Sequence, residues 1–409
     1  MRKIFIYLIY GLLLCFNLIK VEAEVATFHI RITNSWDIEK KGEPIVFKLQ
    51  DFGVDFSIRS SKVYIEGREI ASQLDDLNGD GILDELVFIV DIPSKTTQNI
   101  QLEFSSAEIP NTYCSKVYAE MLLSNPSGEH IPIQSLTIPT SSLVYNHLHH
   151  HGPAFESELV AYRIYFDKKQ TVDIYGKFNK QLEIERSQFY PTDEQLQQGF
   201  GDDVLLVGNS CGLGTLKGWN GKQATHIENA RAFTETIRAY GPIRTVVDII
   251  SHDWHYQNSI LQMNIRYILY AGHRDCEVQV SFNEPLDKKL FCTGLLQIKD
   301  SYFYSNHRGC MALWGTHWPV NDTIKYAKET VGLAISLPEE IVDGETKDSV
   351  NHLYVIKPNH VTSFTYHIIF TSKKETFGFI DEKEWFRYVS QWDKQLKQTI
   401  QIEFLNSTN

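Results

Sequence analysis

The sequence predicts an all-β protein: a small N-terminal β-sandwich, then a large antiparallel β-sandwich and a C-terminal helix. Three observations support this fold class. Many short segments alternate apolar and polar residues at every second position, as half-buried strands do. Turn-forming Gly, Pro, Asn and Ser residues interrupt these segments at short intervals. Helical periodicity, by contrast, is sparse.

The first 23 residues have the pattern of a secretory signal peptide. Arg2 and Lys3 precede an apolar run over residues 4–18, and small residues lead to a cleavage position after Ala23. A membrane anchor is the alternative, but the run is shorter than the ~20 residues that span a bilayer. A lipoprotein would use Cys15, which lacks the small preceding residue expected there. We therefore expect export to the periplasm or the outside of the cell.

Charge and cysteine content narrow the choice of partners. The net charge of −12 argues against a nucleic-acid partner, because binding to a phosphate backbone needs a basic surface. A polyanionic substrate remains compatible, since a local basic pocket can exist on an acidic protein. Five of the six cysteines follow the signal peptide, without C-x-x-C spacing, and allow a disulfide in an oxidising compartment without indicating which.

Residues 24–112 are predicted to form the small sandwich, of immunoglobulin-like size. Its clearest strands are Thr27–Thr33, Lys62–Glu66 and Ile100–Phe104. Residues 113–139, rich in Ser, Pro and Thr, are expected to connect it to the larger domain, residues 140–409.

Strands in the larger domain are expected at 158–166, 170–175, 204–207, 245–250, 263–270, 276–282, 310–314, 330–337, 353–356 and 364–370. Residues 229–239 are a weak helix candidate. Residues 381–397 are a stronger one, because Asp381 can cap the helix and Glu384 follows three residues later.

An acidic turn in the small domain matches a Ca²⁺-binding loop. Oxygen-bearing side chains recur at alternate positions, with glycines between them and a main-chain carbonyl to complete the set. The ligands indicated are Asp76, Asn78, Asp80, Ile82 through its carbonyl, Asp84 and Glu85. Val87 stands where such loops carry a bidentate Glu, and the alternative is a solvated turn. We expect a structural calcium ion.

The sharpest concentration of reactive side chains lies between His147 and Tyr165. Four histidines fall within five residues, followed by two carboxylates, an Arg and two tyrosines. If residues 156–166 form one strand, Glu156 and Glu158 face one way, and Arg163 and Tyr165 face the other. Asp173, Tyr175 and Lys177 then lie on the next strand. Aromatic faces and charged groups together suit a sugar-binding site.

Three interpretations of this segment compete. His149 and His151 share a face on a strand and could ligate a metal with Glu156 or Glu158. Without a metal, His, Tyr and Arg provide a base, an acid and a carboxylate-binding group, which suits β-elimination from a uronic acid. The third interpretation is a polar loop with locally hydrogen-bonded histidines.

Residues 199–219 are glycine-rich but lack the P-loop spacing, so no nucleotide cofactor is expected. A turn there could place Trp219 beside a ligand. His226 and Arg231 follow closely enough to reach the same cleft.

Four segments carry a resemblance to a known family: His150–Phe166, Val172–Lys177, Asp202–Gly214 and Tyr240–Arg244. Together with the Asp76 turn, they resemble a family of exported bacterial proteins with a domain of unknown function, found in polysaccharide-utilisation systems. The resemblance spans most of residues 60–370. It implies a mutarotase-like or lyase-like β-sandwich and, by association, a glycan ligand. It does not imply a particular reaction.

The sequence therefore indicates an exported carbohydrate-active protein acting on uronate-containing oligosaccharides, through lyase-type elimination. The alternatives are a non-catalytic glycan-binding protein and a glycoside hydrolase or epimerase. The candidate catalytic residues are His150, His151, Glu158, Arg163, Tyr165 and Tyr175. The candidate substrate-binding residues are Glu156, Lys177, Trp219, His226 and Arg231.

Overall fold

The computed structural model describes residues 23–405 except 111, 143, 145–146 and 287. The predicted signal peptide lies outside the described residues, apart from Ala23. None of the described helices is long and apolar enough to cross a lipid bilayer.

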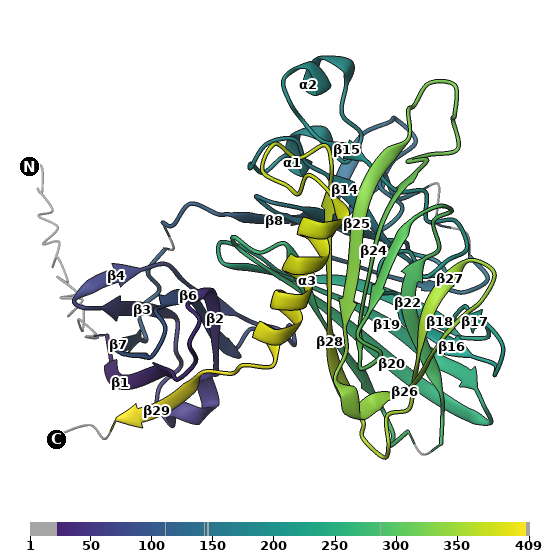
Figure 1. The fold of residues 1–409 in the computed structure, drawn as a ribbon. Coiled ribbons are helices and arrows are strands. Elements are labelled where there is room, and N and C mark those ends of the chain that lie inside the picture. Colours follow the sequence, from purple (N-terminus) through teal and green to yellow (C-terminus); the bar gives the residue numbers. More distant parts are fainter. Residues whose placement is uncertain (1–22, 111, 143, 145–146, 287, 406–409) are drawn as a thin grey trace, which may run out of the picture.

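The structure confirms the all-β fold class (Figure 1). In the N-terminal part, two antiparallel sheets pack face to face around an apolar core that includes Ile30, Phe88 and Phe104. One sheet has the order β29-β1-β7-β3-β4 and the other has the order β2-β6-β5. The elements are β1 (Val25–Asn34), β2 (Lys40–Lys48), η1 (Leu49–Phe52), β3 (Ser60–Ile65), β4 (Arg68–Ile70), β5 (Ser72–Asp75), β6 (Glu85–Ile92), β7 (Thr96–Ser105) and β29 (Gln401–Leu405).

A nine-stranded antiparallel sheet forms one layer of the larger sandwich. Its order is β11-β18-β19-β20-β21-β28-β25-β24-β23. The strands are β11 (Ser135–Pro139), β18 (Ala232–Tyr240), β19 (Arg244–Tyr256), β20 (Ser259–Tyr270), β21 (Asp275–Phe282), β28 (Ser363–Ser372), β25 (Glu329–Ser336), β24 (Cys310–His317) and β23 (Tyr302–Ser305).

Two five-stranded sheets form the opposite layer. The first has the order β15-β14-β13-β12-β8, with β15 (Asp202–Asp203), β14 (Val172–Gly176), β13 (Ala161–Ile164), β12 (Ala154–Ser157) and β8 (Val117–Glu120). The second has the order β17-β16-β22-β27-β26, with β17 (Ala224–Thr225), β16 (Lys217–Trp219), β22 (Phe291–Leu296), β27 (Asn351–Ile356) and β26 (Val342–Lys347). The short elements are β9 (Leu122–Ser124), β10 (His130–Pro132), α1 (Ile184–Ser187), α2 (Asp193–Gln197) and η2 (Glu339–Ile341).

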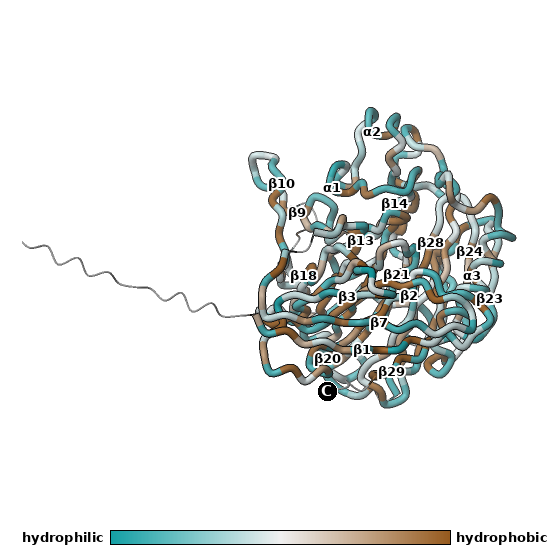
Figure 2. Tube along the Cα trace, turned by 90° about the vertical axis from the view of Figure 1, so that its left-hand side faces the viewer, coloured by the Kyte–Doolittle hydropathy of each residue, from teal (hydrophilic) through white to brown (hydrophobic). Residues whose placement is uncertain are grey.

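One apolar core joins the two layers. Tyr162 and Ile174 from the first five-stranded sheet pack in the same cluster as Tyr354 from the second and Tyr267 from the nine-stranded sheet. Apolar and polar residues alternate along many strands (Figure 2), so each sheet turns one face to this core. The outer face of part of the nine-stranded sheet packs on α3, whereas the outer face of the β8–β12–β13–β14 sheet carries polar and charged side chains.

The C-terminal segment ties the two sandwiches together. Helix α3 (Glu382–Leu396) confirms the predicted helix, and the Asp381 side chain accepts a hydrogen bond of 2.9 Å from the Glu384 amide. Its Trp385 and Val389 pack on β24 and β25. The chain then returns to the small sandwich, where β29 pairs with β1.

Several local predictions were wrong. Residues 229–239 contain β18, because β11 and β19 flank this segment and it alternates in and out of the core. Residues 204–207 form no strand, and only the two residues before them do so, as β15. Residues 156–166 form a hairpin of β12 and β13, in which Ala154 pairs with Arg163. Glu156 and Arg163 therefore face the same way, which corrects the predicted faces.

The cysteines remain reduced. Cys114, Cys211, Cys276, Cys292 and Cys310 are all free thiols, so no disulfide forms within the described residues.

Candidate functional site

The outward side chains of β8, β12, β13 and β14 make a polar face, which is the candidate site. Residues that pair across adjacent antiparallel strands point their side chains to the same face of the sheet. Arg163 on β13 pairs with Asp173 on β14, so these two charged side chains lie next to each other. The polar face is composed of Tyr118, Glu120, Ala154, Glu156, Ala161, Arg163, Asp173 and Tyr175. The opposite sides of the same strands, with Phe155 and Tyr162, lie in the core.

Arg163 is the centre of this polar face. Its side chain is 2 % exposed. Nη1 donates to the Tyr190 hydroxyl at 2.9 Å, and Nη2 donates to the Tyr165 hydroxyl at 2.9 Å. Nη2 also pairs with Asp173 and lies 3.2 Å from Oδ2 of Asp203. The Tyr165 hydroxyl in turn donates to Asp173 at 2.9 Å. One guanidinium is thus shared by two carboxyl groups.

Burial and the two neighbouring charged groups determine the pKa of Asp203. Burial raises its pKa well above the ordinary value and the neighbouring Asp173 raises it further, while Arg163 opposes both effects. Burial and the charge of Asp173 also raise the pKa of Tyr165. Asp203 therefore holds its proton to a higher pH than an exposed aspartic acid does, which is the property of a general acid.

His149 has the opposite tendency. Burial lowers its pKa to about 4, and the nearby His150 and His130 add to the effect. Its ring lies 3.6 Å, centroid to centroid, from that of His130 and 5.3 Å from that of Tyr190. His149 is therefore a neutral imidazole at pH 7 and able to accept a proton. The sequence interpretation had placed it only in a metal site.

The two predicted catalytic histidines differ in access. His150 is fully buried, and its Nε2 lies 2.8 Å from Oε1 of Glu120. His151 is partly exposed, and its ring stacks on that of Tyr165 at 6.2 Å. Burial of His150 argues against its direct contact with a ligand, so its catalytic role stays an untested prediction.

Glu156, Lys177 and Tyr175 are also enclosed. Glu156 and Lys177 are both fully buried and form an ion pair, and Glu156 accepts hydrogen bonds from the amides of Glu183 and Ile184. The Tyr175 hydroxyl donates to Glu183 at 2.9 Å. These groups satisfy one another beneath α1 and help to hold α1 on the sheet, which argues against the roles at a sugar that the sequence predicted for them.

The remaining predicted residues lie in different parts of the larger domain, away from Arg163. Glu158 lies in the turn between β12 and β13 and accepts a hydrogen bond of 2.9 Å from the Gly272 amide. Trp219 packs in an apolar cluster with Cys211 and Cys292, which argues against its predicted contact with a ligand. Arg231 pairs with Asp253 on the exposed side of β18 and β19. These residues do not join Arg163. His226 lines a separate small pocket.

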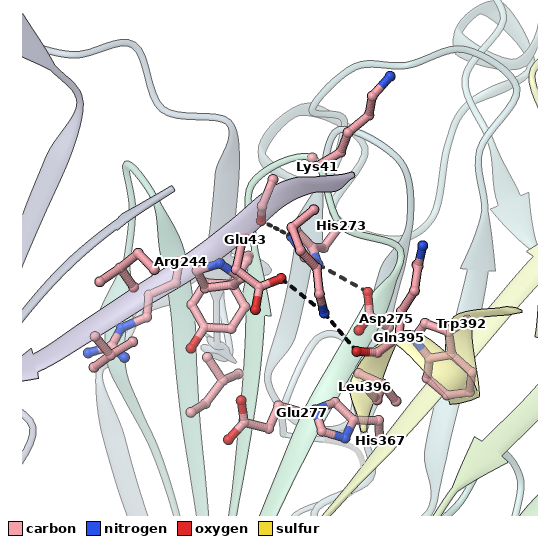
Figure 3. Close-up of a pocket in the computed structure, with 18 of the residues that line it drawn as sticks. Lys41, Glu43, Arg244, His273, Asp275, Glu277, His367, Trp392, Gln395 and Leu396 are labelled. Carbon is pink, nitrogen blue, oxygen red and sulfur yellow. Dashed lines mark hydrogen bonds and ion pairs between the residues drawn. The ribbon is translucent and has the colours of Figure 1, made fainter. Parts of the chain in front are cut away.

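A larger hollow, the interdomain pocket, separates β2 from β20, β21 and α3 (Figure 3). Its volume is about 710 Å³. Its polar groups bind one another across the boundary: His273 contacts Gly42 and Asp275, and the Lys40 ammonium donates to the carbonyl of Gln395 at 2.7 Å. These contacts across the pocket therefore help to hold the two sandwiches together.

The acidic turn between β5 and β6 is closed by its own hydrogen bonds. Asp76 accepts from the amides of Gly79 and Gly81 at 2.7 and 2.8 Å, and these bonds lower its pKa. Oδ2 of Asp84 accepts from the Leu77 amide at 2.6 Å. Glu85 pairs with Arg244 at 2.7 Å, so this predicted ligand is already occupied. Asp76, Asn78, Asp80, Asp84 and the Ile82 carbonyl remain on the turn, and calcium binding there stays a prediction.

No three His, Cys, Asp or Glu side chains converge to hold a metal ion within the described ranges. This geometry argues against the predicted metal site of His149 and His151 with Glu156 or Glu158. In the described structure, Glu156 is committed to Lys177 and Glu158 to Gly272.

Taken together, the fold and the polar face define a large antiparallel β-sandwich protein with buried acid–base side chains on the outer face of one sheet. The chain belongs to the DUF4861 family, a domain of unknown function, whose family model matches residues 32–402. No curated protein matches it.

Two solved structures are similar to this chain at 9 % sequence identity. One is described as a protein in the glycosyl hydrolase family 38 from Enterococcus faecalis, with a TM-score of 0.50 over 93 % of this chain and 47 % of that chain. The other is described as an alpha-mannosidase from Enterococcus faecalis V583, with a TM-score of 0.47 over 93 % and 46 %. This chain thus spans about half the length of those proteins, and the likeness concerns the fold alone.

Proposed function

We propose that this chain is a carbohydrate-active enzyme that cleaves uronate-containing oligosaccharides by β-elimination at the polar face. It would act in the periplasm or outside the cell, as the predicted signal peptide indicates. The supporting observation is the arrangement around Arg163: its guanidinium lies 3.2 Å from Asp203 and donates to Tyr190, whose ring lies 5.3 Å, centroid to centroid, from that of His149. His149 is neutral and can take a proton, and Asp203 retains a proton that it can give.

In this proposal, His149 removes the proton from the sugar carbon that carries the carboxylate. The electron pair of that C–H bond forms the new carbon–carbon double bond, and the bond to the glycosidic oxygen breaks. Asp203 protonates the departing oxygen. Tyr190, 43 % exposed, provides a ring on which the sugar can stack.

A positive group must offset the charge that builds on the substrate carboxylate during proton removal. Arg163 is committed to Asp173 and Asp203, so it serves to position these acids. Lys169 is a partly exposed cation near them, and its Nζ lies 3.7 Å from Oδ2 of Asp167. Its Nζ lies 5.6 Å from the centroid of the Tyr165 ring, and its side chain is 27 % exposed.

Glycoside hydrolysis is the second candidate, and the shared guanidinium favours it. Two carboxyl groups in one site, one of them holding a proton, are the minimum that hydrolysis of a glycosidic bond requires. Asp173, however, is only 1 % exposed, which limits its access to a sugar. Elimination needs one proton-donating acid rather than two carboxyl groups, and Asp203 is more exposed than Asp173, so we place elimination first.

The products distinguish these reactions. Incubating the full chain with a panel of uronate-containing oligosaccharides should produce the ultraviolet absorbance of an unsaturated uronate, with no water added in the product masses. Products that are each saturated, with one water added across the cleaved bond, would identify a hydrolase instead. Saturable binding without any product would identify a non-catalytic glycan-binding protein.

A further inference from the structure

A pocket of about 260 Å³, here called the Lys217 pocket, opens beside β16 and β17. Its wall includes Ser210, Lys217, Thr225, His226, Asp348 and Asn351. This volume suits one sugar unit rather than an extended chain, because pockets for drug-sized ligands begin near ~300 Å³. Lys217 lies in the glycine-rich segment 199–219 but is not among the predicted site residues, and the site described above does not use it.

Lys217 is a buried ammonium group without an acidic partner. It is 1 % exposed, and among the residues described no carboxylate lies within ion-pair distance of its Nζ. Nζ donates to the main-chain carbonyl of Lys169 and lies 3.3 Å from Oγ1 of Thr171. An ammonium has three N–H donors, so one of them remains for a ligand.

The charge of Lys217 persists near neutral pH despite its burial. Burial lowers its pKa to about 8, and Asp167 is among the groups that raise it again. A buried cation that lacks a counter-ion destabilises the folded protein unless an anion can join it. This position therefore favours the arrival of a negatively charged ligand.

His226 contributes a second unsatisfied group to the same pocket. Within the described part of the chain, its Nδ1 is buried and has no hydrogen-bond partner. Burial and then the charge of Lys217 lower its pKa to about 4, so the ring is neutral at pH 7. A neutral imidazole protonated on Nδ1 donates one hydrogen bond there.

The other charges around the pocket largely have partners. Lys168 pairs with Glu228 at 2.7 Å, and Lys169 lies 3.7 Å from Asp167. The Asp348 carboxylate accepts hydrogen bonds from the amides of Ala224, Val350 and Asn351 and from the Asn351 side chain. Asp348 is thus held by its own turn, and Lys217 is the group left for an incoming anion.

We propose that the Lys217 pocket is a subsite that binds the carboxylate of a sugar acid, with Lys217 as its charged donor and His226 as its second donor. The identity of the ligand as a sugar rests on the proposed function. The carboxylate belongs to a sugar unit beside the one that reacts.

Lys169 links this subsite to the polar face. Its main-chain carbonyl accepts from Lys217, and its Nζ lies 5.6 Å from the Tyr165 ring centroid. That ring centroid lies 4.8 Å from Cζ of Arg163. A chain of sugars that carries more than one carboxylate can therefore contact both places.

Isothermal titration calorimetry on the full chain with free galacturonate and glucuronate tests the subsite. At least one of these acids should bind, and neutral galactose and glucose should bind at least tenfold more weakly. Lys217→Met should reduce the affinity for the acid at least tenfold. Lys222→Met, at an exposed position in the neighbouring loop, should leave it unchanged.

His226→Phe provides a second variant, because its partly exposed ring can be replaced without leaving a cavity. It should also abolish binding of the acid by filling the pocket and removing Nδ1. If Lys217→Met does not fold, normal binding by His226→Phe overturns the proposal. Equal binding of acidic and neutral sugars overturns it as well, and so does equal binding of inorganic sulfate and the sugar acid.

Failure of the proposed function would look different. Binding of the acid that depends on Lys217, without any cleaved product, would preserve the subsite and reject β-elimination. Product formation that is unaffected by Lys217→Met, together with unaffected binding, would preserve the enzyme and reject the subsite.

Discussion

Nη2 of Arg163 lies 3.2 Å from Oδ2 of Asp203 while the same nitrogen pairs with Asp173. Two acids therefore share one guanidinium in a buried setting. Two neighbouring carboxyl groups cannot both ionise readily, and the one whose pKa is raised more keeps its proton. This relationship makes Asp203 the candidate proton donor and gives the first prediction.

Asp203→Asn should lower kcat by about 10²–10⁴-fold, because an amide cannot donate a proton to the leaving oxygen. Its oxygen can still accept from Arg163, so the fold should persist. In the native protein, activity should fall as the pH rises through the elevated pKa of Asp203. A pH–rate profile on an active oligosaccharide provides the measurement.

Asp202→Asn is the matched control for this change. Asp202 is adjacent in β15 and pairs with Gly176, whereas Asp203 pairs with Tyr175, so the two side chains leave β15 on opposite sides. The control should retain activity. A comparable loss in both variants would mean that the segment, and not the acid, is required.

His149→Ala should also reduce kcat by about 10²–10⁴-fold, since it removes the neutral imidazole that accepts the proton. The acidic limb of the native pH–rate profile should fall near pH 4, where His149 becomes protonated. His307→Ala, at a largely exposed histidine, is the control and should have native activity. Unchanged turnover by His149→Ala would assign the base to another residue.

The sequence predicted the fold class because alternation along strands depends on local patterning. The sequence also singled out a segment whose Arg163, Tyr165 and Asp173 come together in the structure. The single strand predicted over 156–166 failed because the turn between β12 and β13 lacks Gly and Pro. The Ser157 hydroxyl closes that turn instead, accepting from the Leu159 amide at 3.1 Å.

Other parts of the site depend on long-range packing that no local pattern reveals. Burial keeps His149 neutral, and His150 and His130, which β10 brings against it, add to the effect. Glu156 is enclosed because α1 folds over the sheet and its amides donate to the carboxylate. Lys217 lies in a segment that otherwise resembles a core strand. Its lack of a counter-ion becomes visible only when β16 is placed between its neighbours.

Lys177→Met should destabilise the folded protein by about 3–5 kcal/mol, because it leaves the Glu156 carboxylate buried without its cation. Burial already raises the pKa of Glu156, and loss of Lys177 would raise it further. Urea denaturation monitored by circular dichroism measures the change. Lys383→Met, at an exposed position of α3, should alter stability by less than about 0.5 kcal/mol.

Calcium should raise the melting temperature if the acidic turn binds it. The side chains of Asp76, Asp80 and Asp84 place three negative charges on one short turn, and a cation relieves their repulsion. Saturating calcium stabilises the protein by mass action. Asp80→Asn should weaken this effect, and magnesium should produce a smaller one. An unchanged melting temperature in millimolar calcium would refute the prediction.

His273 should make the junction between the two sandwiches sensitive to pH. Its Nε2 lies 2.6 Å from the Gly42 carbonyl and its Nδ1 lies 3.1 Å from Oδ1 of Asp275, so a doubly protonated ring satisfies both partners. Hydrogen bonds and charge from Asp275, with the Gly42 bond, outweigh burial and raise the pKa of His273 to about 8. The same contact lowers the pKa of Asp275 to about 2 despite burial.

The sign of the effect follows from these shifts. Because the pKa of His273 is higher in the folded state, its stabilisation is complete below about pH 6.5 and disappears as the pH rises through about 8. The loss should be on the order of 2 kcal/mol, because the pKa of His273 is raised from 6.5 to about 8 in the folded protein. Urea denaturation at pH 6 and pH 9 should show this difference in the native protein and a smaller one in His273→Gln. An equal difference in both proteins would assign the pH sensitivity to other groups, since Gln can bond to Gly42 but cannot carry the charge that Asp275 faces.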